Sequence, residues 1–186
     1  MVTERGAAVS AFGVAFTPKI LNAGWCGTEI SRIIDLMKLA EKGRYASPPQ
    51  LKPAAQRVSE AIAKWPGVQA RSHWLLGNEG EVDGADFYLG QDELGHIHLD
   101  SEAHVMHARP VVQALIKAGL GQPFHWSGDV VVFAIRTQAD VEHALWLFQL
   151  SYDRRQGLDN AELLARIAGY VVSSASAAAH SELRVR

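Results

Sequence analysis

The segment from Val68 to Met106 restricts the fold most, because its side chains follow a two-residue period. Apolar or small residues alternate with polar ones from Val68 to Trp74, as they do in a half-buried strand. Polar loops and tight turns then separate three further strand-like segments, 86–89, 93–99 and 103–106. Tight turns join antiparallel neighbours, because two parallel strands need a long crossover connection. We therefore predict an antiparallel sheet made of hairpins.

Helical patterns lie on both sides of this segment. Apolar residues recur every three or four positions from Glu29 to Lys42, and Thr28 can cap this first helix. Similar patterns predict helices at 53–64, 108–118, 140–152 and 159–177, and an unbroken apolar run predicts a central strand at 129–135. We expect an α+β fold with a mostly antiparallel sheet of about four to five strands. Helices would pack mainly on one face, with helical N- and C-terminal segments.

Composition and charge exclude several classes of protein. Residues 1–27 contain too many glycines and prolines for one long element, so we expect an N-terminal arm there and a single α+β domain at 28–186. The formal net charge is −2 and the basic residues are scattered, which argues against nucleic-acid and acidic-membrane partners. No apolar run is long enough to cross a bilayer, and a single cysteine, Cys26, excludes an internal disulfide. These features predict a cytoplasmic protein and leave its oligomeric state open.

Histidines concentrate in one predicted hairpin, at His96, His98 and His104. Residues two apart in a strand share a face, so His96 and His98 should point the same way as Leu94. Glu93 and Ile97 should point the other way, toward the helices. The histidines would then lie in a cleft on the face that the helices leave open.

The position of His104 depends on the turn between the two strands. A three-residue loop, Asp100 to Glu102, pairs Leu99 with Ala103 and places His98 opposite His104, with Cβ atoms about 5 Å apart. A two-residue loop would turn His104 to the other face. We expect the three-residue loop.

Two neighbours of the histidines add information about the strand. Gly95 in a strand interior marks a bulge or a close approach of another element. Glu93 has the wrong parity for the histidine face unless a bulge intervenes, so we expect it to support the histidines or the structure instead.

Three interpretations of this cluster remain open on the residues alone. A divalent metal could be held by His96, His98 and His104, since histidines two apart on a strand are common ligands. Alternatively, the histidines could act without metal, one as a base and another as the stabiliser of the resulting anion. The third interpretation is a set of hairpin histidines without a role.

An ordered set of motifs resembles the fungal luciferase family. These motifs are E-L-G-H-I-H at 93–98, His104 after a short gap, K-A-G-L-G-Q at 117–122, V-V-V-F-A-I-R at 130–136 and L-S-Y-D at 150–153. The likeness covers about 87–155, within a luciferase-like core at about 68–155. More exactly, the segment resembles bacterial relatives that are usually labelled luciferase-domain proteins of unknown function.

The resemblance implies an oxygen-using enzyme that needs no organic cofactor. Fungal luciferases oxidise a hydroxylated pyrone, 3-hydroxyhispidin, with O₂ to an unstable peroxide, which loses CO₂ and emits light. Such chemistry needs a base to form the substrate anion and a dry pocket for the oxygenated intermediate. His96, His98 and His104 match the family's histidine motif, and Glu93 matches its acidic residue. The substrate would be a small aromatic or enolic molecule.

Further residues are candidates for substrate binding. The family's later histidine falls at Phe124 on direct counting, and His125 stands one place further along. Trp126 and Tyr152 could line a pocket for a planar substrate. The expected site therefore contains Glu93 and the three hairpin histidines as catalytic groups, with substrate contacts from His125, Trp126 and Tyr152.

Overall fold

A computed structural model describes residues 46–75, 78 and 80–183 of the chain. The N-terminal arm expected at 1–27 and the helix expected at 29–42 lie outside the described residues, as does Cys26. Within the described part, no helix is long and apolar enough to cross a membrane.

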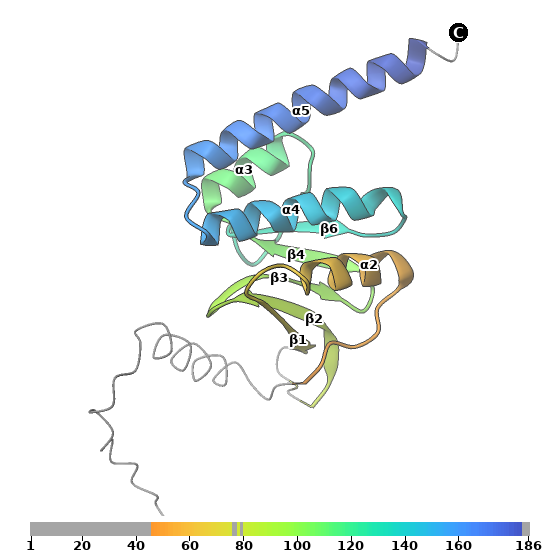
Figure 1. Ribbon diagram of the computed structural model, residues 1–186, viewed down its shortest axis with the longest axis vertical. Coiled ribbons are helices and arrows are strands. Elements are labelled where there is room, and N and C mark those ends of the chain that lie inside the picture. The colour runs from red at the N-terminus through yellow and green to blue at the C-terminus, as the bar shows by residue number, and fades with distance from the viewer. Residues whose placement is uncertain (1–45, 76–77, 79, 184–186) are drawn as a thin grey trace, which may run out of the picture.

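Six antiparallel strands form one sheet (Figure 1). In chain order they are β1 Val68–Trp74, β2 Val82–Leu89, β3 Asp92–His98, β4 Glu102–Met106, β5 Gln122–Pro123 and β6 Val130–Ala134. Their spatial order is β1-β2-β3-β4-β6-β5, and every neighbouring pair is antiparallel. The predicted α+β class is confirmed. The strand count is higher than the expected four to five, because a two-residue strand forms in a segment expected to be irregular or extended.

In the described part of the chain, four helices follow the sequence patterns closely: α2 Pro53–Ile62, α3 Arg109–Lys117, α4 Ala139–Arg155 and α5 Asn160–Leu183. Their ends have local causes. Proline occupies the first turn of α2 and of α3, where its missing N–H is not needed. Gly119, with φ of 71°, ends α3 in a left-handed conformation. The side chain and backbone of Asp159 exchange hydrogen bonds of 2.9 and 3.0 Å with Glu162, which caps α5.

The helices pack over one face of the sheet and over each other (Figure 1). Helix α4 crosses β3 and β4, α3 contacts β6, and α2 contacts β1 and α4. Helix α5 then packs against α3 and α4. The other face of the sheet carries the histidines.

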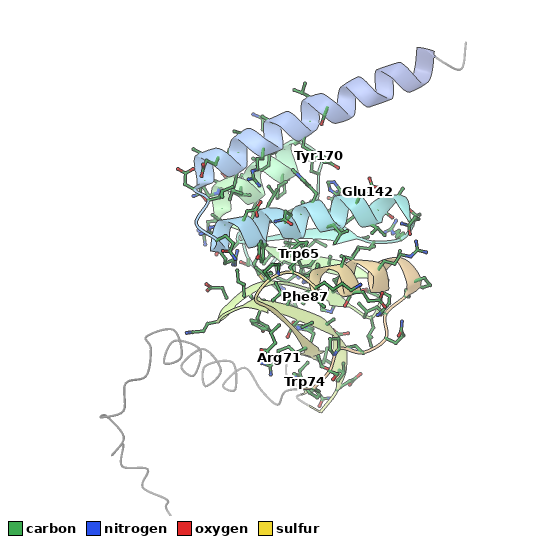
Figure 2. All side chains as sticks on the ribbon, viewed as in Figure 1. Trp65, Arg71, Trp74, Phe87, Glu142 and Tyr170 are labelled. Atoms are coloured by element: carbon green, nitrogen blue, oxygen red, sulfur yellow. The ribbon has the colours of Figure 1, made fainter. Side chains whose placement is uncertain are left out.

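A continuous apolar core fills the space between helices and sheet. Phe87 of β2 meets Phe148 of α4 edge to face, with ring centroids 5.6 Å apart, and Ile97 of β3 is fully buried in the same cluster. Figure 2 shows Trp65 and Phe87 where the helices meet the sheet. This packing fixes β3 and β4 from behind, so their opposite face can present polar side chains in a defined geometry.

Candidate functional site

The β3–β4 hairpin brings His96 and His104 directly opposite each other. The connecting loop has three residues, as predicted, but it consists of Leu99, Asp100 and Ser101 and so starts one residue earlier than expected. The predicted pairing of His98 with His104 is therefore wrong. Because the pairing moves by two residues, the face of His104 is preserved and the histidines still converge.

Ser101 explains where the turn closes. Its φ is 83°, the left-handed conformation that ends a three-residue hairpin loop, and its N–H donates to the carbonyl oxygen of His98 at 2.9 Å. The Asp100 carboxylate accepts the N–H of Glu102 at 2.9 Å, and the Ser101 carbonyl accepts the N–H of Ile135 at 2.9 Å. These bonds favour the observed register over the predicted one.

A β-bulge in β3 turns Glu93 onto the histidine face. Gly95 pairs with Phe87 of β2, but the next pair is Glu93 with Tyr88, so Leu94 is an extra residue. Leu94 consequently enters the apolar core. The expectation that Leu94 shares the histidine face and Glu93 points away is therefore wrong for both residues.

Gly95 is required at this bulge by both its conformation and its surroundings. Its φ is 151°, and an added Cβ would lie 2.4 Å from the carbonyl oxygen of His104 and 2.8 Å from the Phe148 ring. Both features expected of a strand glycine, a bulge and a close approach, are therefore found at this position.

A second irregularity, between β1 and β2, adds another carboxylate. His73 pairs with Gly84 and Trp74 with Val82, which leaves Asp83 as the extra residue. The Asp83 carboxylate then reaches His98, with Oδ2 2.8 Å from Nδ1. Each of the two bulges thus supplies the histidine face with an acid that strict alternation would direct elsewhere.

His73 of β1 joins the cluster, although no motif in the sequence singles it out. Its ring stacks on His96 with centroids 4.0 Å apart and planes at 10°. Its Nδ1 lies 2.7 Å from Asp86, which stands opposite His96 in the β2–β3 register. The available signal was the alternation of β1. It placed His73 on the polar side, but it did not reveal how β1 pairs with β2.

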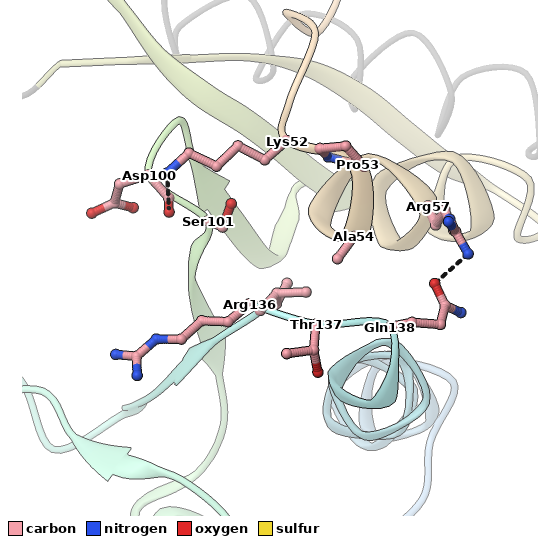
Figure 3. A pocket seen from close by; sticks show the side chains of 10 residues that line it. Lys52, Pro53, Ala54, Arg57, Asp100, Ser101, Arg136, Thr137 and Gln138 are labelled. Carbon is pink, nitrogen blue, oxygen red and sulfur yellow. Dashed lines mark hydrogen bonds between the residues drawn. The ribbon is translucent and has the colours of Figure 1, made fainter.

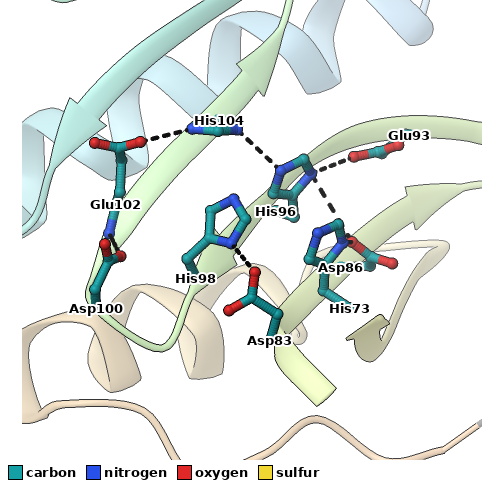
Figure 4. A network of polar contacts seen from close by, with 9 residues as sticks. All are labelled: His73, Asp83, Asp86, Glu93, His96, His98, Asp100, Glu102 and His104. Carbon is teal, nitrogen blue, oxygen red and sulfur yellow. Dashed lines mark hydrogen bonds and ion pairs between the residues drawn. The ribbon is translucent and has the colours of Figure 1, made fainter. Parts of the chain in front are cut away.

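Four side chains form a continuous row of hydrogen bonds across the hairpin (Figure 4). Glu93 Oε1 lies 2.7 Å from His96 Nδ1, His96 Nε2 lies 3.1 Å from His104 Nδ1, and His104 Nε2 lies 2.8 Å from Glu102 Oε1. We refer to these four residues as the carboxylate–histidine row.

Counting protons assigns a charge to this row. Each hydrogen bond needs one proton, so three bonds need three protons, whereas two neutral imidazoles carry only two. With both carboxylates ionised, the two imidazoles together hold one extra proton and a single positive charge. The buried His104, whose pKa is lowered by burial and by the charges of His96 and His98, is then the neutral partner. The carboxylates of Glu93 and Asp86 lie 2.7 and 3.9 Å from Nδ1 of His96.

His98 stands apart from this row and is arranged differently. Its Nδ1 is bound to Asp83, while no hydrogen bond engages its Nε2 within the described part of the chain. Burial and the charge of His96 lower the pKa of His98, against the opposing effect of Asp83. For His73, burial lowers the pKa, but Asp86, Glu93 and Asp83 outweigh it and the net direction is upward. The shift therefore favours the neutral imidazole at His98 and the charged one at His73.

These side chains line a cleft of about 790 Å³. One wall is a row of aromatic rings: Phe124 lies against His104 with centroids 4.7 Å apart, and His125 and Trp126 continue from it. The Trp126 side chain is exposed, at 73%. A cleft with one aromatic wall and a polar floor suits an aromatic or enolic molecule that carries ionisable oxygens.

The predicted substrate contacts are thus only partly brought together. His125 and Trp126 line the cleft, as does Phe124, the position that matches the family's later histidine on direct counting. Tyr152 does not. Its hydroxyl donates to the carbonyl oxygen of Pro66 at 3.0 Å and its ring packs on Trp65, on the helix side of the sheet.

Helix α4 anchors the strand ends that carry the site. The Arg155 guanidinium donates to the carbonyl oxygens of Glu93 at 2.8 Å and Met106 at 3.2 Å. The Ser151 hydroxyl lies 2.9 Å from the carbonyl oxygen of Leu94 and 2.7 Å from that of Met106. This helix end therefore holds the β3 bulge and the end of β4 in place.

The expected metal set is not the one that converges most closely. Ligand atoms of His73, His96 and His98 lie within 4.8 Å of one another, as do those of Asp86, Glu93 and His96. Three imidazoles in such an arrangement suit zinc or another transition metal. His73 takes the place that the sequence assigned to His104.

Comparisons with known proteins bear on the middle of the chain. No curated protein and no solved structure matches it significantly. Residues 91–151, about a third of the sequence, match a family model described as the luciferase domain. The matched segment contains the whole carboxylate–histidine row and His98, whereas His73, Asp83 and Asp86 precede it. The resemblance predicted from the sequence is therefore confirmed for this segment, which is similar to the luciferase domain family.

Proposed function

We propose that this protein is a cofactor-independent, oxygenase-like enzyme that acts on a small aromatic or enolic molecule of the hydroxypyrone type. One observation carries the proposal most directly. His98 lines the cleft with Asp83 bound to one ring nitrogen and the other nitrogen free. Beside it lies the singly charged His96–His104 pair.

The first step is removal of a proton from the substrate. Nε2 of His98 accepts the proton of an enol or phenol hydroxyl, because its lowered pKa keeps it unprotonated near neutral pH. Asp83 accepts the hydrogen bond of Nδ1–H, which fixes the tautomer and stabilises the imidazolium that forms.

The second step is stabilisation of the resulting anion. The His98 ring centroid lies 4.9 Å from that of His96 and 4.7 Å from that of His104, so an enolate formed at His98 is close to the charged pair. Fixed positive charge in a partly buried site stabilises a developing oxyanion more than water does.

The third step uses O₂ as the co-substrate. The electron-rich enolate donates electrons to O₂, and a bond between the substrate carbon and oxygen gives a peroxide. The Phe124 ring, which packs on His104, covers one side of this part of the cleft and limits the access of water to the intermediate. In the related fungal reaction such a peroxide loses CO₂. No organic cofactor takes part in this scheme.

Oxygen uptake tests the proposal. The purified protein would be given a simple hydroxypyrone, 4-hydroxy-6-methyl-2-pyrone, and 3-hydroxyhispidin, and O₂ consumption would be followed with an electrode. His98→Asn should lower the rate by at least about 100-fold, the usual contribution of a general base. Asp83→Asn should lower it less, and Tyr152→Phe should leave it unchanged because that hydroxyl lies outside the cleft. Wild-type rates from folded His98→Asn protein would refute the assignment.

A second candidate function rests on the convergence of His73, His96 and His98. These histidines could hold a divalent metal for a hydrolase, or for a binding domain without turnover. Zinc titration of metal-free protein separates this candidate from the first. His73→Gln should abolish stoichiometric zinc binding if the metal site is real, yet it leaves the His98–Asp83 base in place. Oxygen uptake that survives this substitution and a chelator would favour the metal-free enzyme.

The setting of the proposed enzyme follows from composition. The net charge of −2 provides no electrostatic attraction for nucleic acid or for an acidic membrane. The proposed partner is therefore a small molecule. The single cysteine, which excludes an internal disulfide, supports a reducing compartment such as the cytoplasm.

A further inference from the structure

A second hollow, of about 480 Å³, lies at the Asp100–Ser101 turn (Figure 3). Three basic side chains from separate segments line it: Lys52, Arg57 and Arg136. Lys52 extends to the turn, Arg136 runs along the opposite side of the hollow with its guanidinium directed away from Ser101, and Arg57 lies at the other end beside Gln138. Asp100 lines both the hollow and the histidine cleft.

Within the described part of the chain, the three cations of this hollow have no carboxylate at ion-pair distance. Lys52 Nζ donates to the carbonyl oxygen of Asp100 at 3.1 Å, and Arg57 donates to the amide oxygen of Gln138. None of the three forms an ion pair with any residue that the structure describes. Cations that meet only neutral oxygens keep most of their charge available for a ligand.

Ser101 supplies an independent sign of a missing ligand. It is only 4% exposed, and its hydroxyl oxygen has no hydrogen-bond partner among the described residues. The side chain lies in the hollow between Lys52 and Arg136 (Figure 3). A buried hydroxyl without a partner is costly, so a group that accepts its hydrogen bond would stabilise this arrangement.

The carboxylates near the hollow are already engaged. Asp100 accepts the N–H of Glu102, and Asp140 accepts the N–H groups of Arg136 and Thr137 at 2.9 and 2.6 Å. Helix α2 begins at the hollow with no acidic residue in its first turn and no side-chain cap, so its positive end also faces this space. The electrostatic field therefore favours an anion.

We propose that this hollow binds a phosphate group, held by Lys52, Arg136 and the Ser101 hydroxyl, with Arg57 in reach of a larger molecule. Donors that approach from several directions suit a tetrahedral oxyanion with two negative charges better than they suit chloride or a planar carboxylate. The site does not depend on the reaction proposed for the histidine cleft. The phosphate could be free or could belong to a phosphate ester.

Isothermal titration calorimetry of the whole chain tests this site at constant ionic strength, with inorganic phosphate in one arm and phenyl phosphate in the other. Saturable binding of either probe at one site supports the proposal. Tighter binding of phenyl phosphate would assign the hollow to phosphate esters, whereas equal or weaker binding would assign it to free phosphate. The absence of saturable binding in both arms would overturn the proposal. Because no turnover is measured, failure here is separate from failure of the proposed enzyme.

Three variants locate the bound phosphate. Lys52→Met and Arg136→Met should each weaken binding by about tenfold, the equivalent of one charge-assisted hydrogen bond. Ser101→Gly should weaken it by about fivefold while the protein stays folded, because glycine suits the φ of 83° at this turn.

The control is Lys117→Met, which removes the same charge from an exposed position at the end of α3. It should leave phosphate binding unchanged. Equal losses in the control and in Lys52→Met would show nonspecific attraction only, and an unaltered affinity in Ser101→Gly would show that the phosphate does not bind at the turn. Either result overturns the proposal.

Discussion

Replacing His107 tests whether a buried, unpaired imidazole limits stability in acid. His107 follows β4 and is 2% exposed, and neither ring nitrogen has a hydrogen-bond partner among the described residues. Burial, together with the charges of Arg155 and Arg154, lowers its pKa from 6.5 to about 3. The folded protein therefore keeps this ring neutral at pH values where the unfolded chain protonates it.

The sign and size of the effect follow from proton linkage. Between about pH 3 and 6.5 the unfolded state binds more protons at this position than the folded state, so stability rises with pH across this window. The contribution of the neutral His107 ring to the free energy of unfolding is fully present above about pH 6.5 and is lost as the pH falls toward 3. Lowering the pH from 7.5 to 5 reduces the free energy of unfolding by about 2 kcal/mol through this residue. The size depends almost entirely on the pKa of His107 in the unfolded chain.

His107→Leu removes this titration while it keeps a side chain of similar volume. At pH 7.5 the variant should be at least as stable as the wild type, because two buried nitrogens without partners are removed. At pH 5 it should gain a further advantage of about 2 kcal/mol. Urea unfolding followed by circular dichroism gives the difference in the free energy of unfolding between variant and wild type at each pH. The other histidines contribute equally to both proteins, so their titration does not affect this difference. Equal losses of stability in both proteins between pH 7.5 and 5 would refute the reasoning.

Substitutions at three further positions test the architecture around the cleft. Gly95→Ala should destabilise the fold by about 3 kcal/mol or more in urea unfolding, because φ is 151° and the new Cβ would meet backbone; a loss below about 1 kcal/mol would contradict the close approach. Arg155→Ala should lower the free energy of unfolding by about 2 kcal/mol. Arg155→Lys should not restore this stability, because lysine lacks the forked donors that bridge β3 and β4. Full stability of the lysine variant would show that the charge alone is needed. Tyr152→Phe should lose about 1 kcal/mol in thermal unfolding without altering ligand binding in the cleft, since only its bond to a carbonyl oxygen is removed.

The helices and strands of this fold could be predicted from the periodicity of the sequence, whereas the site depends on two bulges that interrupt this periodicity. Strands at Val68–Trp74 and Asp92–His98 and the helix from Ala139 to Arg155 lie within a few residues of their predicted bounds. Alternation identified the shared face of His96 and His98 correctly. The same rule misplaced Glu93, because one extra residue in β3 inverts every side chain before it.

Residues that reach the cleft from β1 and β2 could not be assigned from the sequence. His73 and Asp83 depend on a register shift between two strands, and no local pattern encodes that shift. Tyr152 was selected as an aromatic residue near a matching motif, yet it shares the apolar face of α4 with Phe148, which indicated packing against the core. Helical periodicity was the more reliable guide for this residue.

The carboxylate–histidine row has a consequence for the movement of protons. Its three hydrogen bonds link Glu93, whose side chain is 23% exposed, to Glu102, whose side chain is 46% exposed. If the proton of the central bond moves from one imidazole to the other, the single positive charge moves with it, while all three hydrogen bonds and all heavy atoms stay in place. The row thus holds one charge that can lie next to either carboxylate.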